Sequence, residues 1–309
     1  MRDTTPPPIV GILLSTYNGA AFLHEQLASF DAQDGASWRL FWRDDGSSDG
    51  SVAIMRAYAA SRPHVVQLDD AAHLGVTGSY MSLLRHAVAH GTGPVAFADQ
   101  DDVWMGGKLA RALHALREQA GAGPLLYCSR QVLVDVALNR LGESDPIRVP
   151  PSLCPALTQN IATGCTVVLD AAAAALVAGS APPSASLHDW WSYLVVTAAG
   201  GRVIADHDPT VKYRQHPQNA VGAPGSKRRR AMAALRRGPA AYMALLRAHV
   251  RALRDQPALL SPEARESVAA IGSALDGGLV ARLRVLRRFG LLRQTRAETW
   301  LFRCWFLLG

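Results

Sequence analysis

Short apolar segments alternate with amphipathic ones over the first 140 residues, and this alternation constrains the fold more than any other feature. The run from Pro8 to Leu14 is apolar throughout, as expected of a strand buried on both faces of a parallel sheet. Further strands are predicted at 38–43, 64–68, 94–98 and 125–134, with helices near 23–30, 51–61, 77–89 and 109–116. This order predicts an α/β fold with a mainly parallel sheet, flanked by helices.

Three polar loops directly follow predicted strands: Ser15–Gly19, Asp44–Gly50 and Asp99–Asp102. In open α/β sheets, ligands bind beyond the carboxyl ends of the strands. We therefore expect these loops to line one crevice.

The third loop is acidic, because Asp99, Asp101 and Asp102 place three carboxylates within four residues. Side chains two apart on an extended strand end point the same way, so Asp99 and Asp101 can converge. Converging carboxylates favour a bound divalent cation such as Mg²⁺ or Mn²⁺, which would bridge them to a diphosphate. The alternative is a solvated acidic turn that caps the helix near Met105. The preceding strand and the two other loops favour the metal site.

The second loop also has two interpretations. Asp45 can accept a hydrogen bond from a nucleotide base, while Asp49 or Ser48 can cap the following helix. The two roles are compatible.

Beyond residue 140 the alternation weakens. The Trp-rich segment Leu187–Trp191 is predicted to open a helix, two short strands are predicted at 202–205 and 210–214, and a linker at 222–226. The remaining chain carries Arg-rich helical patterns and a net charge of +12 over 227–309, against −5 over 1–226. At 279–289, the face of Leu279, Leu283 and Leu286 lies opposite Arg284 and Arg288, as in helices that lie on anionic membranes. The alternative is a helical appendage packed on the rest of the chain.

Other features restrict the class of protein. No apolar run is long enough to span a bilayer, the N-terminal segment lacks a signal-peptide pattern, and the four cysteines form no CxxC pair. We therefore expect a cytoplasmic protein, with peripheral contact to the inner face of the membrane through its basic end. No nucleic-acid-binding motif accompanies the basic charge, so nucleic acid is not an expected partner.

The three loops, read as Ser15–Gly19, Arg43–Asp49 and Asp99–Trp104, resemble the successive signatures of family 2 glycosyltransferases. The resemblance spans about residues 8–222 and implies the GT-A fold. Asn160–Cys165, His188–Trp191 and Tyr213–His216 are similar to the rhamnosyltransferase subgroup. One departure is His73 in the segment His73-Leu74-Gly75, where many relatives have Asn, so the usual Asn contact near the nucleotide is in question.

The resemblance also implies a division of the chain and a set of roles. Residues 1–120 would bind the nucleotide sugar and 121–222 the acceptor, with a basic helical region at 223–309. Asp189 would be the catalytic base. The other roles fall to three groups: nucleotide-sugar binding by Thr16, Tyr17, Asn18, Asp45, Gly75, Asp99 and Arg214; Mn²⁺ or Mg²⁺ binding by Asp101, Asp102 and His216; and acceptor binding by His188, Trp190, Trp191 and Gly164.

The implied reaction is a transfer of one sugar with inversion, in cell-surface polysaccharide synthesis. The donor would be dTDP-L-rhamnose and the acceptor a glycan or lipid-linked glycan. Alternatives are another UDP- or GDP-sugar donor, a metal-dependent nucleotidyltransferase, or a basic nucleic-acid-binding protein. At the level of single residues, Asp189 could instead cap the helix near Trp190, and one of Trp190 and Trp191 is expected in the core. Cys165 is expected to be a packing residue.

Overall fold

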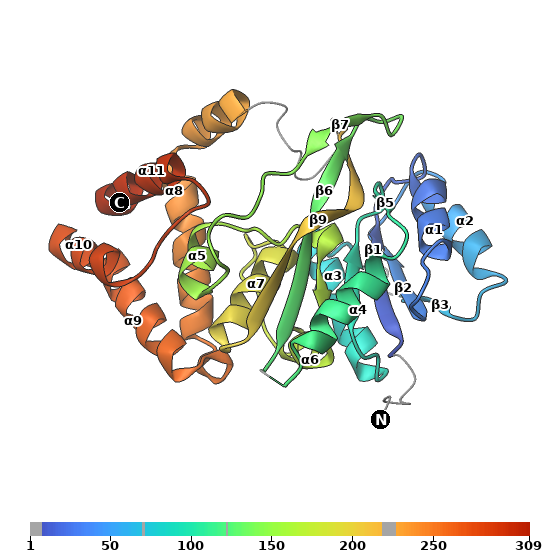
Figure 1. Cartoon of the computed structure of the whole chain (residues 1–309), viewed down its shortest axis with the longest axis horizontal. Helices are drawn as coiled ribbons and strands as arrows, with labels where there is room; N and C mark the ends of the chain where they lie inside the picture. The colour runs from blue at the N-terminus through green and yellow to red at the C-terminus, as the bar shows by residue number, and fades with distance from the viewer. Residues whose placement is uncertain (1–7, 70–71, 122, 218–226) are drawn as a thin grey trace.

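One nine-stranded sheet runs through the described part of the chain, with helices on both of its faces (Figure 1). The structure is a computed structural model that describes residues 8–69, 72–121, 123–217 and 227–309, without the side chains of 227–237. The strand order is β3-β2-β1-β4-β8-β6-β9-β5, with β7 paired to β6. The α/β fold with helices flanking the sheet is confirmed.

The N-terminal half of the sheet is parallel. Thr16 at the end of β1 pairs with Asp44 at the end of β2, and Leu14 pairs with Ala98 at the end of β4, so these strands end at one edge. The strands and the helices between them are β1 (Val10–Thr16), α1 (Leu23–Asp31), β2 (Trp38–Asp44), α2 (Ser51–Ala59), β3 (Val65–Gln67), α3 (Gly75–Ala89) and β4 (Val95–Ala98).

The continuous apolar runs are explained by two cores, one on each face of the sheet. Along β1, Leu13 belongs to the core that includes α3, whereas Ile12 and Leu14 belong to the core that includes α1 and α4. Because side chains alternate along a strand, a strand covered on both faces must be apolar at every position.

The second half of the sheet is mixed, although its longest pairing, β6 with β9, is parallel. β8 is antiparallel to β4 and β6, and β5 is antiparallel to β9. The elements are β5 (Val103–Trp104), α4 (Lys108–Glu118), β6 (Leu125–Val134), β7 (Arg140–Glu143), α5 (Leu153–Thr158), a 3₁₀ turn (Gly164–Thr166), β8 (Val168–Leu169), α6 (Ala171–Ala178), α7 (His188–Ala198) and β9 (Arg202–Arg214).

The prediction of two short strands at 202–205 and 210–214 was wrong, because β9 is one strand across both. Its register against β6 shifts on either side of Arg130, which lies opposite Pro209. Proline lacks the N–H that a regular ladder needs, and an irregularity lets the strand pass it. In the sequence, such a bulge is indistinguishable from a loop.

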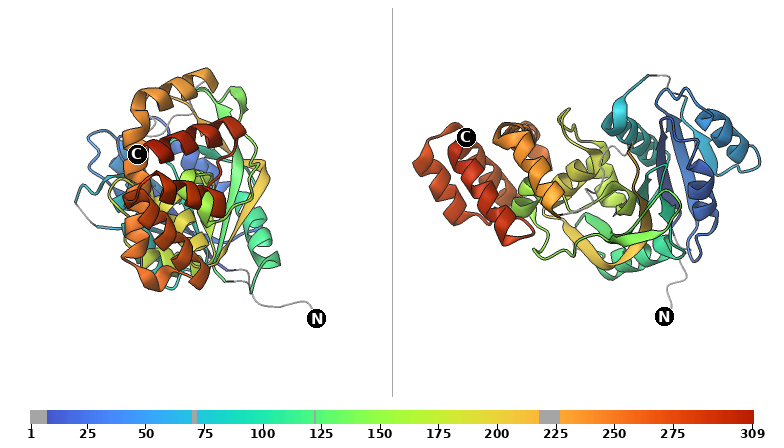
Figure 2. Two further views of the ribbon diagram at one scale, coloured as in Figure 1. Left: turned by 90° about the vertical axis from the view of Figure 1, so that its left-hand side faces the viewer. Right: turned by 90° about the horizontal axis from the view of Figure 1, so that it is seen from above.

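The basic C-terminal region is helical, as expected, and it packs against α5 and α7 (Figure 2). Trp191 of α7 shares one buried cluster with Leu246, Val268 and Phe302 from three of the C-terminal helices. None of the described helices has both the length and the apolarity to cross a bilayer. The predicted linker at 222–226 lies outside the described residues. The C-terminal elements are α8 (Lys227–Arg254, kinked at Gly238), a 3₁₀ turn (Pro257–Leu259), α9 (Pro262–Asp276), α10 (Leu279–Arg288) and α11 (Arg296–Leu308).

Candidate functional site

The three polar loops meet at the carboxyl edge of the parallel strands, as the sequence predicted. Gln100 joins the first loop to the third, since its side chain accepts from Tyr17 N and donates to Tyr17 O, both at 2.9 Å. Asn18 joins the first loop to the second: its backbone N–H donates to Ser47 Oγ at 2.9 Å, and its Oδ1 accepts from Ser48 N at 2.8 Å. The three loops therefore form one connected surface.

This junction explains the glycine in the first loop. A Cβ atom on Gly19 would lie 2.2 Å from Oε1 of Gln100, far inside van der Waals contact. The neighbouring Asn18 has φ of 49°, a left-handed conformation that Asn tolerates better than most residues. Asn18 and Gly19 thus allow the backbone conformation that positions Tyr17.

Thr16 and Tyr17 differ in what they offer to a ligand. Thr16 is buried and donates its hydroxyl to Asp44 Oδ1 at 2.8 Å, whereas Tyr17 is 52% exposed. Only Tyr17 presents a surface to a nucleotide here, so the predicted contact of Thr16 is indirect. Asp49 accepts from the backbone N–H of Ser51 at 2.9 Å, but the N-cap residue of α2 is Gly50 and no side chain caps the helix, so the expected capping by Asp49 or Ser48 was wrong.

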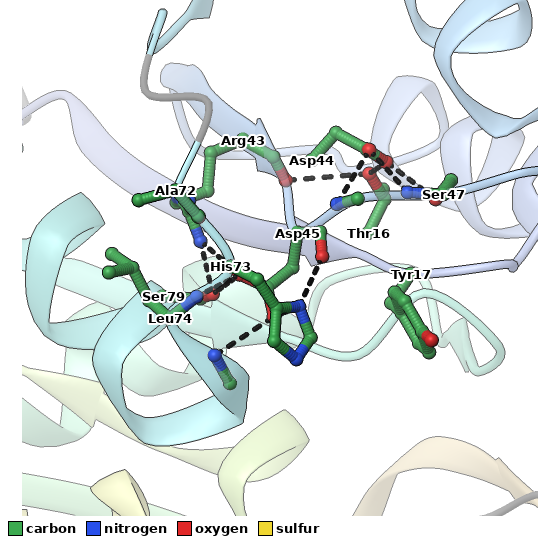
Figure 3. Close-up of polar contacts among 12 residues, drawn as sticks. Thr16, Tyr17, Arg43, Asp44, Asp45, Ser47, Ala72, His73, Leu74 and Ser79 are labelled. Carbon is green, nitrogen blue, oxygen red and sulfur yellow. Dashed lines mark hydrogen bonds and ion pairs between the residues drawn. The ribbon is translucent and has the colours of Figure 1, made fainter.

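Asp45 is the centre of a buried polar cluster (Figure 3). Its Oδ1 accepts from Arg43 Nη1 at 2.7 Å, from Leu74 N at 2.7 Å and from Ser79 Oγ at 3.0 Å, and its Oδ2 accepts from Gly75 N at 2.9 Å. Burial alone would raise the pKa of Asp45, but these hydrogen bonds outweigh it and lower the pKa. Asp45 is thus a carboxylate whose acceptor positions are largely taken by the protein.

The predicted metal ligands do not form one group. His216 Nε2 lies 2.8 Å from Asp101 Oδ2. Asp102 points elsewhere. It is fully buried, and its Oδ1 accepts from the backbone N–H of Arg214 at 3.0 Å. Possible ligand atoms of Asp102, Asp99 and Cys165 all lie within 4.8 Å of one another. The chain turns between Asp101 and Asp102, so the expected trio is separated into two places.

Burial and mutual repulsion dominate the electrostatics of the acidic loop. Burial and the charge of Asp101 raise the pKa of Asp99 to about 7, and burial raises that of Asp102 well above its usual value. Behind Asp102, the buried ammonium of Lys108 lies 3.7 Å from the centre of the Trp104 ring. Burial lowers the pKa of Lys108 to about 7.

These surroundings decide which residues suit a divalent cation. Asp102 already has a cationic neighbour in Lys108, and the Cys165 thiol, whose pKa burial raises, is a poor ligand for hard ions. Asp99 and Asp101 are partly exposed, and after burial the charge of Asp101 is the next cause of the raised pKa of Asp99. Asp99 and Asp101 are therefore candidates to hold Mn²⁺ or Mg²⁺, with His216 beside Asp101.

Asp189 lies in the first turn of α7 and is only 7% exposed. Its Oδ1 accepts from Trp190 N at 2.6 Å and its Oδ2 from Gly164 N at 2.9 Å. Burial raises the pKa of Asp189 to about 6. These two hydrogen bonds and one from Asn160 favour the anion and lower the pKa, but burial outweighs them. The charge of Asp189 also contributes to the raised pKa of Asp99, so the two carboxylates belong to one electrostatic site.

The alternative in which Asp189 caps a helix near Trp190 is corrected by this geometry. The helix begins at His188, the residue at the N-cap position is Leu187, and Asp189 lies inside the first turn. Gly164, predicted to contact the acceptor, holds the Asp189 carboxylate instead, and a Cβ there would lie 3.0 Å from His188 Nε2.

Two of the predicted acceptor residues are buried. This corrects the expectation for His188, and it confirms that one of Trp190 and Trp191 lies in the core. His188 is 4% exposed and stacks on Tyr80 with ring centres 3.8 Å apart. Trp191 is fully buried and donates to Ser180 Oγ at 2.7 Å. Trp190 is half-buried and donates to Ala156 O at 2.7 Å, so it is the Trp whose acceptor contact stays a prediction.

Arg214 is likewise enclosed, contrary to the expectation that it faces the diphosphate. Its guanidinium is buried above the Phe22 ring, donates to Asp101 O at 2.8 Å and pairs with Glu25. In this structure it fastens the acidic loop to α1. Glu25 was missed from the sequence, where it is one of several polar residues on a helix. Lys108 was missed as well. Gln100 and Asn160 lie within the predicted motifs, but only their spatial neighbours reveal their roles.

Comparisons with known proteins show which family and fold the chain resembles. Residues 12–146 match the family model Glycosyl transferase family 2. The chain is 25% identical over 224 residues to the dTDP-rhamnosyl transferase RfbG of Shigella flexneri, covering 68% of this chain and 74% of that protein. It is 29% identical over 101 residues to the UDP-Glc:alpha-D-GlcNAc-diphosphoundecaprenol beta-1,3-glucosyltransferase WfgD of Escherichia coli, covering 33% of this chain and 38% of that protein.

Solved structures show the same fold. S. aureus TarS 1-349 in complex with UDP-GlcNAc superposes with a TM-score of 0.57 at 16% identity, over 86% of this chain and 72% of that one. The mannosyltransferase PcManGT from Pyrobaculum calidifontis, in complex with GDP-Man and Mn²⁺, superposes with a TM-score of 0.51 at 18% identity, over 99% and 86%. The fold and these comparisons together indicate a glycosyltransferase with the GT-A fold. Through the match over residues 12–146 the chain resembles the family 2 glycosyltransferases and, among them, the rhamnosyltransferase subgroup.

Proposed function

We propose that this enzyme transfers L-rhamnose from dTDP-L-rhamnose to a glycan or lipid-linked glycan, in the synthesis of a cell-surface polysaccharide. The donor is supported by the similarity to a dTDP-rhamnosyl transferase over 68% of the chain. A lipid-linked acceptor is supported by the similarity to WfgD, whose name gives a diphosphoundecaprenol-linked substrate. The second candidate is a UDP- or GDP-sugar donor, because the structures with the same fold were solved with UDP-GlcNAc and GDP-Man.

The observation that carries the catalytic part of the proposal is the buried carboxylate of Asp189. Two backbone N–H groups hold it in place next to the acidic loop, and its pKa of about 6 leaves it ionised yet basic near neutral pH. In the proposed reaction, Asp189 takes the proton of the acceptor hydroxyl while that oxygen forms the new bond to the anomeric carbon. The bond to the diphosphate breaks in the same step, and the anomeric configuration inverts.

The remaining site residues position the donor. Asp99 and Asp101 would hold Mn²⁺ or Mg²⁺, which would offset the negative charge of the diphosphate leaving group. A Mn²⁺ complex of a protein with the same fold supports this assignment. The exposed ring of Tyr17 would lie against the nucleobase, at the carboxyl edge of β1 and β2.

The test is a donor screen with purified enzyme and a lipid-linked glycan acceptor, with and without Mn²⁺. dTDP-L-rhamnose, UDP-glucose, UDP-GlcNAc and GDP-mannose would be compared by release of nucleoside diphosphate and by mass of the product. We expect dTDP and a product heavier by one deoxyhexose. Turnover of a UDP- or GDP-sugar alone would select the second candidate, and no turnover of any sugar would contradict both.

We further propose that α10 contacts the cytoplasmic face of the membrane. Leu279, Val280 and Leu283 are exposed on this helix, and Arg284 and Arg287 are exposed beside them. The predicted face is corrected in one position: Leu286 packs on the core and Val280 takes its place at the surface, 69% exposed. Exposed apolar and basic side chains on one helix suit an anionic bilayer, to which each Arg adds about 1 kcal/mol.

Flotation with vesicles containing anionic lipid tests this contact on the full chain, because the C-terminal helices share the core with α7. Arg284→Glu combined with Arg287→Glu should abolish binding. The matched control reverses two exposed arginines elsewhere, Arg56→Glu with Arg117→Glu. Equal binding by both double variants would contradict the contact.

A further inference from the structure

A buried histidine of α8 connects the C-terminal region to the start of α7. His249 is fully buried, and its ring packs against both Trp rings of α7, with ring centres 5.0 Å from Trp190 and 6.5 Å from Trp191. Its Nε2 lies 2.8 Å from Ser186 Oγ, within hydrogen-bond distance. His249 therefore contacts both the loop that leads into α7 and the first turn of that helix.

The loop before α7 is held by two elements at Ser186. The backbone oxygen of Ser186 accepts from Thr77 Oγ1 of α3 at 2.7 Å, and its side chain meets His249 of α8. Ser186 is only 2% exposed, so water competes little for these contacts. The chain is thus fixed three residues before Asp189.

Trp190 links His249 to the carboxylate of Asp189. The backbone N–H groups in the first turn of a helix have no partner within the helix, and that of Trp190 donates to Asp189 Oδ1 at 2.6 Å. The indole of the same residue donates to Ala156 O at 2.7 Å, and its ring meets the His249 ring at an angle of 63°. A shift of the Trp190 ring would therefore move the group that holds Asp189.

His249 acts through geometry and not through charge. Burial lowers the pKa of His249 to about 4, so the ring is neutral near neutral pH. A phenyl or leucyl side chain could fill the same space beside the Trp rings, but it could not form a hydrogen bond to Ser186. The histidine therefore combines packing with a polar contact at one buried point.

We propose that His249 is a positioning residue, which holds the first turn of α7 so that the carboxylate of Asp189 meets the acceptor hydroxyl. The inference rests on the proposed role of Asp189 as the base. A catalytic group that is displaced by about 1 Å can lose about 10²-fold in rate, so a residue that never touches the substrate can control the rate. The C-terminal region is then part of the catalytic unit, in addition to its proposed membrane contact.

The first experiment separates kcat from KM in the full chain. His249→Leu should lower kcat about ten- to hundredfold and leave the KM for the donor unchanged, because the contacts of His249 lie outside the three polar loops. His249→Gln can still bond to Ser186 and should recover most of kcat.

The matched control is the next residue of α8. A Cβ on Gly272 of α9 would lie 3.3 Å from Val250 Cγ1, so Val250 faces α9 and not the Trp rings. Val250→Ala removes buried methyl groups and should lower the free energy of unfolding, but it should keep the kcat of the wild type.

A double-mutant cycle tests whether His249 acts through Asp189. In the Asp189→Asn background the base is gone, so adding His249→Leu should lower kcat by less than about twofold. A purely structural effect of His249 would reduce kcat by the same factor in both backgrounds.

Hydrogen exchange gives a readout that needs no sugar transfer. Peptides that contain the amides of Gly164 and Trp190, the two N–H groups bonded to Asp189, should exchange at least about threefold faster in His249→Leu and at the wild-type rate in Val250→Ala. Ser186→Ala cuts the same link from the other partner and should give the same result, so it replaces His249→Leu if that variant does not fold.

Three results would overturn the inference: wild-type kcat in His249→Leu, an equal loss of kcat with and without Asp189, or unchanged exchange of the two amides. Failure of the proposed function looks different. A wild type that transfers no sugar would refute the glycosyltransferase reaction, while the exchange experiment would still decide whether His249 holds Asp189.

Discussion

Replacing Asp189 by Asn removes the proposed base while keeping the size of the side chain. The amide oxygen can still accept one of the two hydrogen bonds from Gly164 N and Trp190 N. A general base contributes about 10²–10⁴-fold to the rate, so transfer by Asp189→Asn should fall by that factor. Donor affinity should change little, because the described contacts of Asp189 are with the protein.

The same substitution should alter stability with a sign that depends on pH. The pKa of Asp189 rises from 3.8 to about 6 on folding, which corresponds to about 3 kcal/mol. A carboxyl group with a raised pKa stabilises the fold fully below pH 4 and loses that contribution as the pH rises through 6. Asparagine does not titrate. Relative to the wild type, the variant should therefore gain about 3 kcal/mol in free energy of unfolding between pH 4 and pH 7.

Both effects can be measured on one pair of proteins. The kcat/KM of the wild type between pH 4.5 and 8 should fall about tenfold per pH unit below 6, since only the ionised base is active. Urea unfolding at pH 4 and pH 7 gives the stability difference. Asp255→Asn, at an exposed position on the loop after α8, serves as the matched control.

Two results would refute the reasoning. Transfer by Asp189→Asn within tenfold of the wild type would show that this carboxylate is not the base. A stability difference that is the same at pH 4 and pH 7 would show that Asp189 is not a buried, titrating group with a raised pKa.

Four further predictions test other parts of the structure. Gln100→Ala should weaken dTDP binding about tenfold in calorimetry, since it removes both hydrogen bonds that hold Tyr17; unchanged affinity would contradict this. Chelation by EDTA should abolish transfer and Mn²⁺ restore it, and full activity in EDTA would exclude the metal. Phe302→Ala should lower the free energy of unfolding by about 3–5 kcal/mol in a single urea transition, whereas an independent C-terminal unit would unfold separately. Burial raises the pKa of Asp206, but hydrogen bonds from Arg111, from the Asp208 backbone and from Tyr127 lower it overall to about 2. The wild type should therefore lose about 2 kcal/mol in free energy of unfolding between pH 4 and pH 2. Urea unfolding of Asp206→Asn should not show this loss.

The sequence alone determined the elements of the parallel half of the sheet and their order. The central positions of strands β1, β2 and β4 are covered on both faces and are therefore apolar, and this makes the strands visible without a structure. Polar loops that directly follow such strands must lie at one edge of a parallel sheet. The meeting of the Ser15, Asp44 and Asp99 loops could therefore be predicted before any contact was known.

The direction of each side chain was decided by tertiary structure. Asp101 and Asp102 are neighbours in sequence, yet one pairs with His216 and the other is enclosed near Lys108 and Cys165, because the chain turns between them. The burial of individual side chains is also decided by tertiary structure. His188 and Trp191 are in the core because other elements cover them, and covering depends on residues far away in the sequence.

The continuity of β9 across Pro209 has the same origin, because a bulged strand is recognised by its partner strand. Local sequence sets what each residue can do, through its polarity and backbone preferences. Which of these capacities is used depends on long-range packing, which brings distant residues into contact.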